Sequence, residues 1–576
     1  MTHRIERRLV DVGPTLRALD VGPVLARVYA GRGVRDAAEL EHTLERLLDF
    51  RALRGIDEAV ELLVHAVTHG ERILIVGDFD ADGATSTAVA VRALRACGAR
   101  DVHYVVPDRF RFGYGLTPEI VAVALQREPA LIITVDNGIS SVAGVAAAKA
   151  EGVRVLVTDH HLPGATLPAA DAIVNPNQPD DAFPSKAIAG VGVIFYVMLA
   201  LRAALRTQDW FAKRGMREPN LAELLDLVAL GTVADVVPLD HNNRILVAQG
   251  LARIRAGRCC PGIQALFEVA GRSRSIAVAG DLGFAVAPRL NAAGRLEDMG
   301  SGIACLLSDE PGEARRLAQR LDGLNRERRV IEAQMHQQAV AHIETLLVDE
   351  DSELPLGVCL FDEDWHEGVV GIVASRIKER LHRPVIAFAA TDAQTLKGSG
   401  RSVAGLHMRD ALDSIAARHP GMLSKFGGHA MAAGLSLERS HFEDFAAAFN
   451  EEVGRHVSED QLRGVVVSDG ELSADEVSLE LAESLRYAGP WGQGFPEPVF
   501  DGCFEVVQRR IVGERHLKLV LRLANADQLI DAIAFNTTDA DWPPATSSIW
   551  AAYRLDVNEY LGARSVQLVI EHLQPC

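Results

Sequence analysis

From residue 72 onward the chain alternates short apolar runs with stretches of helical periodicity. The runs are RILIVGDFD (72–80), VHYVVP (102–107), LIITVDNG (131–138), VRVLVTDHH (153–161) and LVALGTVADVVPL (227–239), and helices are expected over 85–96 and 142–151. Runs that are apolar on both faces and alternate with helices are typical of a parallel sheet joined by crossover helices. We therefore predict a doubly wound α/β domain with a strand at each run.

Three further patterns follow along the chain. Residues 310–347 contain almost no Gly or Pro after Gly323 and carry arginines between apolar positions at helical spacing, which predicts one long connector helix. A second α/β unit starts at LPLGVCLF (354–361) and runs through a helix over 404–417 to about residue 454. Beyond residue 464 the runs become short and β-rich (504–513, 516–523, 528–536, 548–560 and 565–573), which predicts a small barrel of the oligonucleotide-binding (OB) type.

Composition and charge limit the possible partners. With 576 residues, 48% of them hydrophobic, the chain can build several cores, and we expect three or four domains. A net charge of −19 would repel a polyanion if it were spread evenly, so any nucleic-acid site must be locally basic or filled by cations. Two stretches have such a local basic excess: 397–430 contains five Lys or Arg against two Asp, and 508–522 contains five against one Glu.

The compartment is expected to be the cytoplasm. The seven cysteines show neither CxxC nor zinc-site spacing, which favours reduced thiols. The N-terminal residues have charges without an apolar stretch behind them, and the longest apolar run, near 188–205, contains glycine and is broken by Arg202. We therefore expect neither a signal peptide nor a membrane span.

Carboxylates and imidazoles gather directly after the apolar runs: Asp78, Asp80 and Asp82 in GDFDADG, Asp136 in VDNG, Asp159, His160 and His161 in TDHH, and Asp235 in VADVV. Side chains just past the carboxyl ends of parallel strands meet in one crevice, so these four clusters should form a single site. Carboxylates at such short range raise each other's pKa, and cations among them remove the conflict. Oxygen-rich ligands with one or two imidazoles suit Mn²⁺ or Mg²⁺ better than Zn²⁺. Two such ions about 3.5–4 Å apart would clamp the attacking and leaving oxygens of a phosphoryl transfer.

These motifs carry a resemblance to a known family. GDFDADG, VDNGI, TDHH and GTVADVVPL together resemble the four motifs of the DHH phosphoesterase superfamily. FRFGYGL, APRLNAAGRL, WHEGVVGIVASR, KGSGRS and FGGHAMAAG resemble elements of its RecJ family, over nearly the whole chain. The resemblance implies a 5′ to 3′ exonuclease that degrades single-stranded DNA by two-metal-ion phosphodiester hydrolysis and releases 5′-mononucleotides, in DNA recombination and repair.

The resemblance also implies roles for single residues. The metal ligands would be Asp80 on one ion, Asp82, His160 and Asp235 on the other, and Asp136 as the bridge between them. Two further candidate ligands, expected rather to orient the others, are Asp78 and Asp159. His161 would help to hold the scissile phosphate.

Donor-rich loops outside these motifs are candidates for substrate binding. Ser399 and Arg401 in KGSGRS stand among glycines, whose backbone N–H groups can approach a phosphate, and the resemblance makes them a pocket for a 5′-terminal phosphate. The helix start in WHEGVVGIVASR suits an anion or is an ordinary strand-to-helix turn. Further candidates are the donors Arg109, Arg289, Asn291 and Arg295, Tyr114, which would stack on a base or pack in its loop, and His429, which the resemblance places at the substrate phosphate.

The fold class implied is a multidomain α/β protein. It comprises an N-terminal segment (1–50), a parallel-sheet DHH catalytic domain (51–255), a helical connector (256–350), a second α/β domain of the DHHA1 type that binds substrate (351–460), and an OB-like nucleic-acid-binding barrel (461–576). The partners implied are single-stranded DNA, single-strand-binding protein and a helicase, with no membrane.

Two other functions stand beside this one. A phosphodiesterase of the same superfamily for oligonucleotides or cyclic dinucleotides would leave the β-rich C-terminal module unexplained. A non-catalytic RecJ-like DNA-binding scaffold would have no reason to keep the five ligand residues Asp80, Asp82, Asp136, His160 and Asp235.

Overall fold

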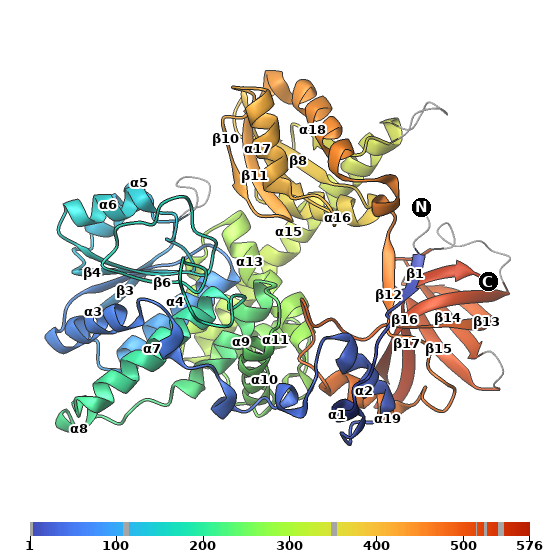
Figure 1. Ribbon diagram of the computed structural model, residues 1–576, viewed down its shortest axis with the longest axis horizontal. Coiled ribbons are helices and arrows are strands. Elements are labelled where there is room, and N and C mark those ends of the chain that lie inside the picture. The colour runs from blue at the N-terminus through green and yellow to red at the C-terminus, as the bar shows by residue number, and fades with distance from the viewer. Residues whose placement is uncertain are drawn as a thin grey trace. The chain divides into compact units, whose positions relative to one another are not determined.

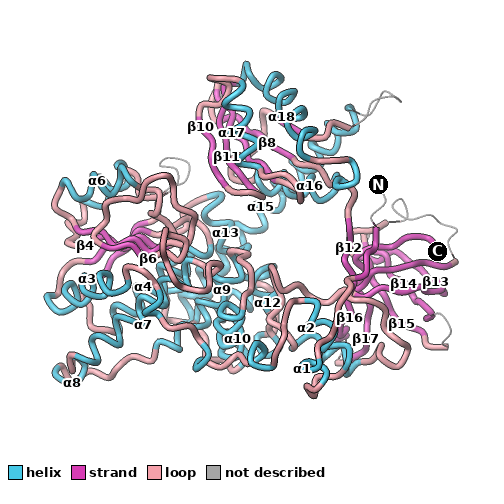
Figure 2. The backbone as a smooth tube through the Cα atoms, viewed as in Figure 1, coloured by secondary structure: helices cyan, strands magenta, loops and turns pink. Residues whose placement is uncertain are grey.

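A computed structural model describes residues 4–107, 115–346, 354–513, 515–523, 527–538, 547–560 and 562–576. The chain packs as two compact units. The larger unit comprises Arg7–Asn325 and Ser468–Cys576, and the smaller unit comprises Met1–Glu6 and Arg326–Val467. Each unit has its own hydrophobic core. Figure 2 shows the strands of the two α/β sheets and of the barrel in magenta.

The larger unit contains a five-stranded parallel sheet of order β3-β2-β4-β5-β6. The strands are β2 (Ile73–Val76), β3 (Val102–Val105), β4 (Leu131–Val135), β5 (Arg154–Thr158) and β6 (Ala172–Val174). Ile73 and Ile75 share a core with α3 (Ile56–His69), α4 (Ala81–Ala96) and α7 (Gly190–Thr207). Leu74 and Val76 face α5 (Pro118–Leu125) and α6 (Val142–Ala150) on the opposite side (Figure 1). The predicted doubly wound sheet is thus confirmed.

The strand predicted over 227–239 is wrong. This segment forms the helix α9 (Leu225–Ala234), and α10 (His241–Arg255) follows it. All eight residues from Leu225 to Thr232 are buried. A short, fully buried apolar run does not reveal whether its period is that of a strand or of a helix, and here it is a helix.

Helices fill the rest of this part of the larger unit. They are α8 (Trp210–Lys213), α11 (Pro261–Val269), α12 (Ala279–Asp281), α13 (Ala287–Leu296) and α14 (Gly300–Leu307), with a π-helical turn, η6 (Leu282–Val286), between α12 and α13. The predicted connector helix is confirmed as α15 (Pro311–Leu346). Helix α7 is long and apolar enough to cross a membrane. However, 67% of its 18 residues are buried inside the protein, as in the core helix of a globular domain.

The smaller unit is a second α/β domain, as predicted. Its sheet has the order β10-β11-β9-β8-β7, with β7 and β8 parallel and the other pairs antiparallel. The strands are β7 (Val358–Phe361), β8 (Val385–Ala390), β9 (Thr395–Arg401), β10 (Lys425–Gly428) and β11 (Ala432–Glu438), and the helices are α16 (Val370–Leu381), α17 (Met408–Arg418) and α18 (Phe442–His456). The helix predicted over 404–417 begins only at Met408.

The C-terminal region forms the predicted closed barrel, with strand order β13-β14-β15-β17-β16. Its strands are β13 (Phe500–Val512), β14 (His516–Leu523), β15 (Leu529–Ala534), β16 (Ser548–Tyr560) and β17 (Ala563–Pro575). Along β14, Leu517, Leu519 and Leu521 are buried and alternate with partly exposed residues, which is the pattern of a strand with one face toward a core. The helix α19 (Leu479–Tyr487) precedes the barrel.

The N-terminal segment, which carries no recognisable motif, is tied to the region just before the barrel. It contains β1 (Arg4–Arg7), which pairs with β12 (Val465–Ser468), and the helices α1 (Pro14–Arg17) and α2 (Pro23–Gly31). Tyr29 stacks on Trp491 and Phe495. Arg32 and Asp469 form an ion pair with side chains only 1% and 3% exposed. The two ends of the sequence therefore share one core.

Candidate metal centre

The loop between β2 and α4 supplies Asp78 and Asp80, and the first turn of α4 supplies Asp82. Asp80 caps α4, and its Oδ1 accepts a hydrogen bond from the Gly83 N–H at 3.0 Å. Asp78 accepts one from the Phe79 N–H at 2.8 Å. Asn291 on α13 accepts a hydrogen bond from the Ala81 N–H at 2.8 Å, so this side chain braces the loop that carries the carboxylates.

Asp82 is held at the amino end of another helix. The side chain is buried, and it accepts hydrogen bonds from the Gly190 N–H at 2.7 Å and the Val191 N–H at 3.0 Å, in the first turn of α7. The partial positive charge of that helix end favours a carboxylate there. On the other side, a Cβ at Gly231 of α9 would lie 2.7 Å from Asp82 Oδ1, so glycine is required for this close approach. Sequence reasoning missed both contacts, although the glycines in AIAGVGV and ALGTV were visible.

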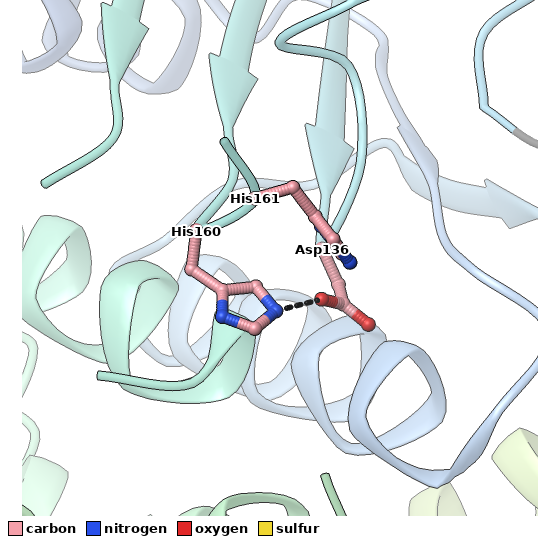
Figure 3. Close-up of side chains that lie close together, drawn as sticks. All are labelled: Asp136, His160 and His161. Atoms are coloured by element: carbon pink, nitrogen blue, oxygen red, sulfur yellow. Dashed lines mark ion pairs between the residues drawn. The ribbon is translucent and has the colours of Figure 1, made fainter. Parts of the chain in front are cut away.

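Asp136 and His160 point toward each other at the ends of neighbouring strands (Figure 3). Asp136 follows β4 with a φ of +63°, and its Oδ1 lies 3.1 Å from Nε2 of His160, which follows β5. The same Nε2 lies 3.5 Å from Oδ2 of Asp235. Asp235 reaches this point from the C-terminal end of α9 and not from a strand, so the site is assembled from three strand ends and one helix end.

His161 has a different environment from His160. Its Nδ1 lies 2.7 Å from Oδ1 of Asp159, and the other oxygen of this buried carboxylate accepts a hydrogen bond from the Ile139 N–H at 2.9 Å. Burial lowers the pKa of His161, but the hydrogen bond and charge of Asp159 outweigh it and raise the pKa to about 9. Asp159 thus favours the protonated form of His161 and holds its ring in orientation.

The acidic cluster cannot be fully ionised without cations. Burial, and then the charges of neighbouring carboxylates, raise the pKa of Asp82 and of Asp136 well above the usual range. The same causes raise the pKa of Asp235 to about 7. Asp235 Oδ2 is buried and accepts no hydrogen bond from any described residue. Both features fit a site built to hold positive charge.

The donor atoms fall into three groups, each within 4.8 Å, that could hold a metal ion: Asp78 with Asp80 and Asp136; Asp82 with His160 and Asp235; and Asp136 with His160 and His161. Asp136 belongs to two of these groups, and it contacts His160 of the group that contains Asp82 and Asp235. Among the described residues Asp159 belongs to none of them. Donor groups that meet at Asp136 would have room for adjacent cations, and their oxygen-rich composition suits Mn²⁺ or Mg²⁺.

The other predicted substrate-binding residues of the larger unit differ in how far they are exposed. Arg289 is buried, and its Nη2 and Nε lie 2.8 and 2.9 Å from Oδ1 of Asp322, so its guanidinium is held inside the unit by a residue of α15. Arg295 lies on the same helix as Asn291, one turn later, and is partly exposed. Arg109 and Tyr114 lie outside the described residues.

The smaller unit brings Ser399 and Arg401 together on one face of β9. Arg401 Nη1 donates to Ser399 Oγ at 3.0 Å and to the Gly400 carbonyl at 2.8 Å. A Cβ at Gly371, in the first turn of α16, would lie 2.8 Å from Arg401 Nη2 and 2.9 Å from Ser399 Oγ. The amino end of α16 thus meets the two side chains directly. Burial lowers the pKa of the Arg401 guanidinium from its ordinary value.

His429 lies elsewhere in this unit, in the connection between β10 and β11. It is exposed, and its backbone N–H donates to the Ala432 carbonyl at 2.8 Å. It therefore lies at the tip of the hairpin formed by β10 and β11.

Comparison with known proteins gives a consistent family assignment. Models of the DHH family N-terminal domain, the DHHA1 domain and the RecJ OB domain match residues 72–232, 354–455 and 468–572. The single-stranded-DNA-specific exonuclease RecJ of Dickeya dadantii is 60% identical over 553 residues, 96% of each chain, and that of Escherichia coli is 56% identical over 573 residues, 99% of each chain. The crystal structure of RecJ in complex with Mn²⁺ from Thermus thermophilus superimposes with a TM-score of 0.81 at 33% identity, covering 100% of this chain and 80% of that one. The chain therefore belongs to the RecJ family of the DHH proteins.

Proposed function

We propose that this protein is an exonuclease that hydrolyses single-stranded DNA from its 5′ end with two Mn²⁺ or Mg²⁺ ions and releases 5′-mononucleotides. The observation that carries the proposal is the contact between Asp136 and His160, 3.1 Å apart, which joins the donor groups around Asp80 and Asp82 into one centre. Relatives that cover nearly the whole chain bear the name of a single-stranded-DNA-specific exonuclease, and solved members hold Mn²⁺ or Mg²⁺.

Each residue of the metal centre has a distinct role in the proposed reaction. Asp78, Asp80 and Asp136 would hold one ion, and Asp82, His160 and Asp235 the other. When bound, the ions supply Lewis acidity and a nucleophile at neutral pH. His161 keeps its proton because Asp159 holds it at Nδ1, so its Nε2–H donates to a non-bridging oxygen of the scissile phosphate and balances the charge that develops there.

Recognition of the 5′ end belongs to the pocket of Ser399, Arg401 and the first turn of α16. A terminal phosphate monoester carries more negative charge than an internal diester, and an arginine beside a helix amino end distinguishes the two. The side chain of Arg401 is already oriented by Ser399, so little rotamer freedom is lost when a phosphate binds.

The barrel and its partners complete the proposal. The barrel would bind the body of the strand, as OB folds do through grooves that follow the backbone. Single-strand-binding protein and a helicase would supply the substrate, in recombination and repair, and the cytoplasm would be the compartment.

The test uses one oligonucleotide labelled at either end. A 5′-phosphorylated single strand should be degraded in Mn²⁺ or Mg²⁺, so that a 5′ label appears at once as a mononucleotide and a 3′ label persists in shortening fragments. The matching duplex should resist. Removal of metal with a chelator should stop release, and adding either ion back should restore it. Release of the 3′ label first, or equal degradation of the duplex, would overturn the assignment.

A further inference from the structure

Two large apolar side chains are exposed on segments that adjoin the metal centre: Val236 follows the candidate ligand Asp235, and Phe284 lies in η6, which packs against α9. Phe284 is 82% exposed and Val236 is 64% exposed. Phenylalanine is among the residue types most often buried, so its exposure in a segment that packs against the ligand-bearing helix α9 makes it a candidate contact for substrate.

Phe284 is held in place by the segments that build the centre. It lies in the π-helical turn η6, and such turns are frequent at functional sites. A Cβ on the preceding Gly283 would lie only 3.2 Å from Cγ1 of Val233, two residues before the candidate ligand Asp235. The helix that follows η6 is α13, whose Asn291 braces the loop of Asp80, and α13 and α9 lie side by side (Figure 1).

Val236 is unusual in its backbone. It follows Asp235 directly and has a φ of +61°, in the left-handed region that a β-branched residue rarely adopts. Strained backbone of this kind is concentrated at ligand-binding sites. The strain turns an apolar side chain outward next to the candidate metal ligand.

We propose that Phe284 is a stacking platform for one nucleobase of the strand whose phosphate lies at the metal centre, and that the exposed Val236 offers the strand a second apolar contact. The proposal rests on the proposed function and adds a specificity element to it. Bases of a single strand have open π-faces, whereas those of a duplex are covered by their neighbours. An aromatic ring at this place therefore stabilises only bound single-stranded substrate. Stacking is tolerant of sequence because every base has such a face.

The experiment moves a missing base along the substrate. In a series of 5′-phosphorylated single strands, one abasic nucleotide is placed at each successive position from the 5′ end, and KM and kcat are measured. For the wild-type protein, one position should raise KM by roughly five- to a hundredfold. Phe284→Ala should show the same increase on the intact strand and no further loss at that position, and Phe284→Trp should restore the wild-type profile.

Two comparisons keep the outcome clear. Tyr487→Ala removes another half-exposed ring, on α19 before the barrel (46% exposed), and should keep the wild-type dependence on position. Melting temperature verifies that each variant is folded. An abasic profile that is identical in wild type and Phe284→Ala overturns the stacking role.

The same oligonucleotides separate this proposal from the exonuclease assignment. If the wild type releases no nucleotide from the intact strand, the exonuclease assignment fails. Anisotropy binding with this series then tests the stacking role alone: a position-dependent loss that vanishes in Phe284→Ala supports it, and a flat profile rejects it.

Discussion

Replacing Arg401 by alanine should remove the preference for a 5′-phosphate. In the folded protein the guanidinium is largely buried beside Ser399 and the first turn of α16, so water substitutes poorly for it. A charge-assisted hydrogen bond contributes about 1.5–3 kcal/mol. At about 1.4 kcal/mol per tenfold change, the loss on a 5′-phosphorylated strand is roughly ten- to a hundredfold in kcat/KM.

The assay compares 5′-phosphorylated and 5′-hydroxyl single strands of one sequence under multiple-turnover conditions. The hydroxyl substrate should be poor for the wild type and little worse for Arg401→Ala. Arg409, an exposed arginine on α17 of the same unit, provides the matched control, because Arg409→Ala removes an equal charge outside the pocket. Equal slowing of both substrates by Arg401→Ala would refute the reasoning.

Three further predictions follow from the packing and charge of the larger unit. Asp469→Ala leaves the Arg32 guanidinium buried without its carboxylate, so the free energy of unfolding in urea should fall by about 3–5 kcal/mol; a change below 1 kcal/mol would contradict the pairing. Gly231→Ala pushes a methyl group against Asp82, so the melting temperature and the Mn²⁺ affinity measured by calorimetry should both fall. A wild-type value for either quantity would contradict this close approach. In the metal-free protein the pKa of Asp235 is about 7 when the protein is folded and about 4 when it is unfolded. The proton on Asp235 therefore makes its full contribution to the free energy of unfolding below about pH 4, and this contribution is lost as the pH rises to 7. Mn²⁺ should therefore raise the melting temperature more at pH 7.5 than at pH 5.5; an equal rise at both would contradict the shift.

The sequence predicts most of the centre because the chemistry follows buried parallel strands. Asp80, Asp136 and His160 are found by the rule that the carboxyl ends of such strands meet at one edge. The rule fails for Asp235, which reaches the same edge from a helix, because a short apolar run has no readable period.

The spacing of motifs in the sequence does not reveal contacts between residues that lie far apart along the chain. The role of Arg289 depends on Asp322, which lies on the connector helix, and nothing near PRLNAAGR reveals that pairing. The N–H groups of α7 on Asp82 are equally distant in sequence. The exposure of Phe284 is not predicted for a different reason: apolar residues are expected inside, and only the folded structure shows that this side chain is exposed.

In the proposed function, Asp136 joins two ions into one hydrolytic centre. Asn is the informative substitution, since it tolerates the left-handed backbone that Asp136 adopts and removes only the charge. The decisive measurement is mononucleotide release from a 5′-phosphorylated single strand by folded Asp136→Asn in saturating Mn²⁺. If Asp136 bridges the two ions, release should be no faster than that of the metal-free wild type, and turnover close to that of the wild type in Mn²⁺ would rule the bridge out.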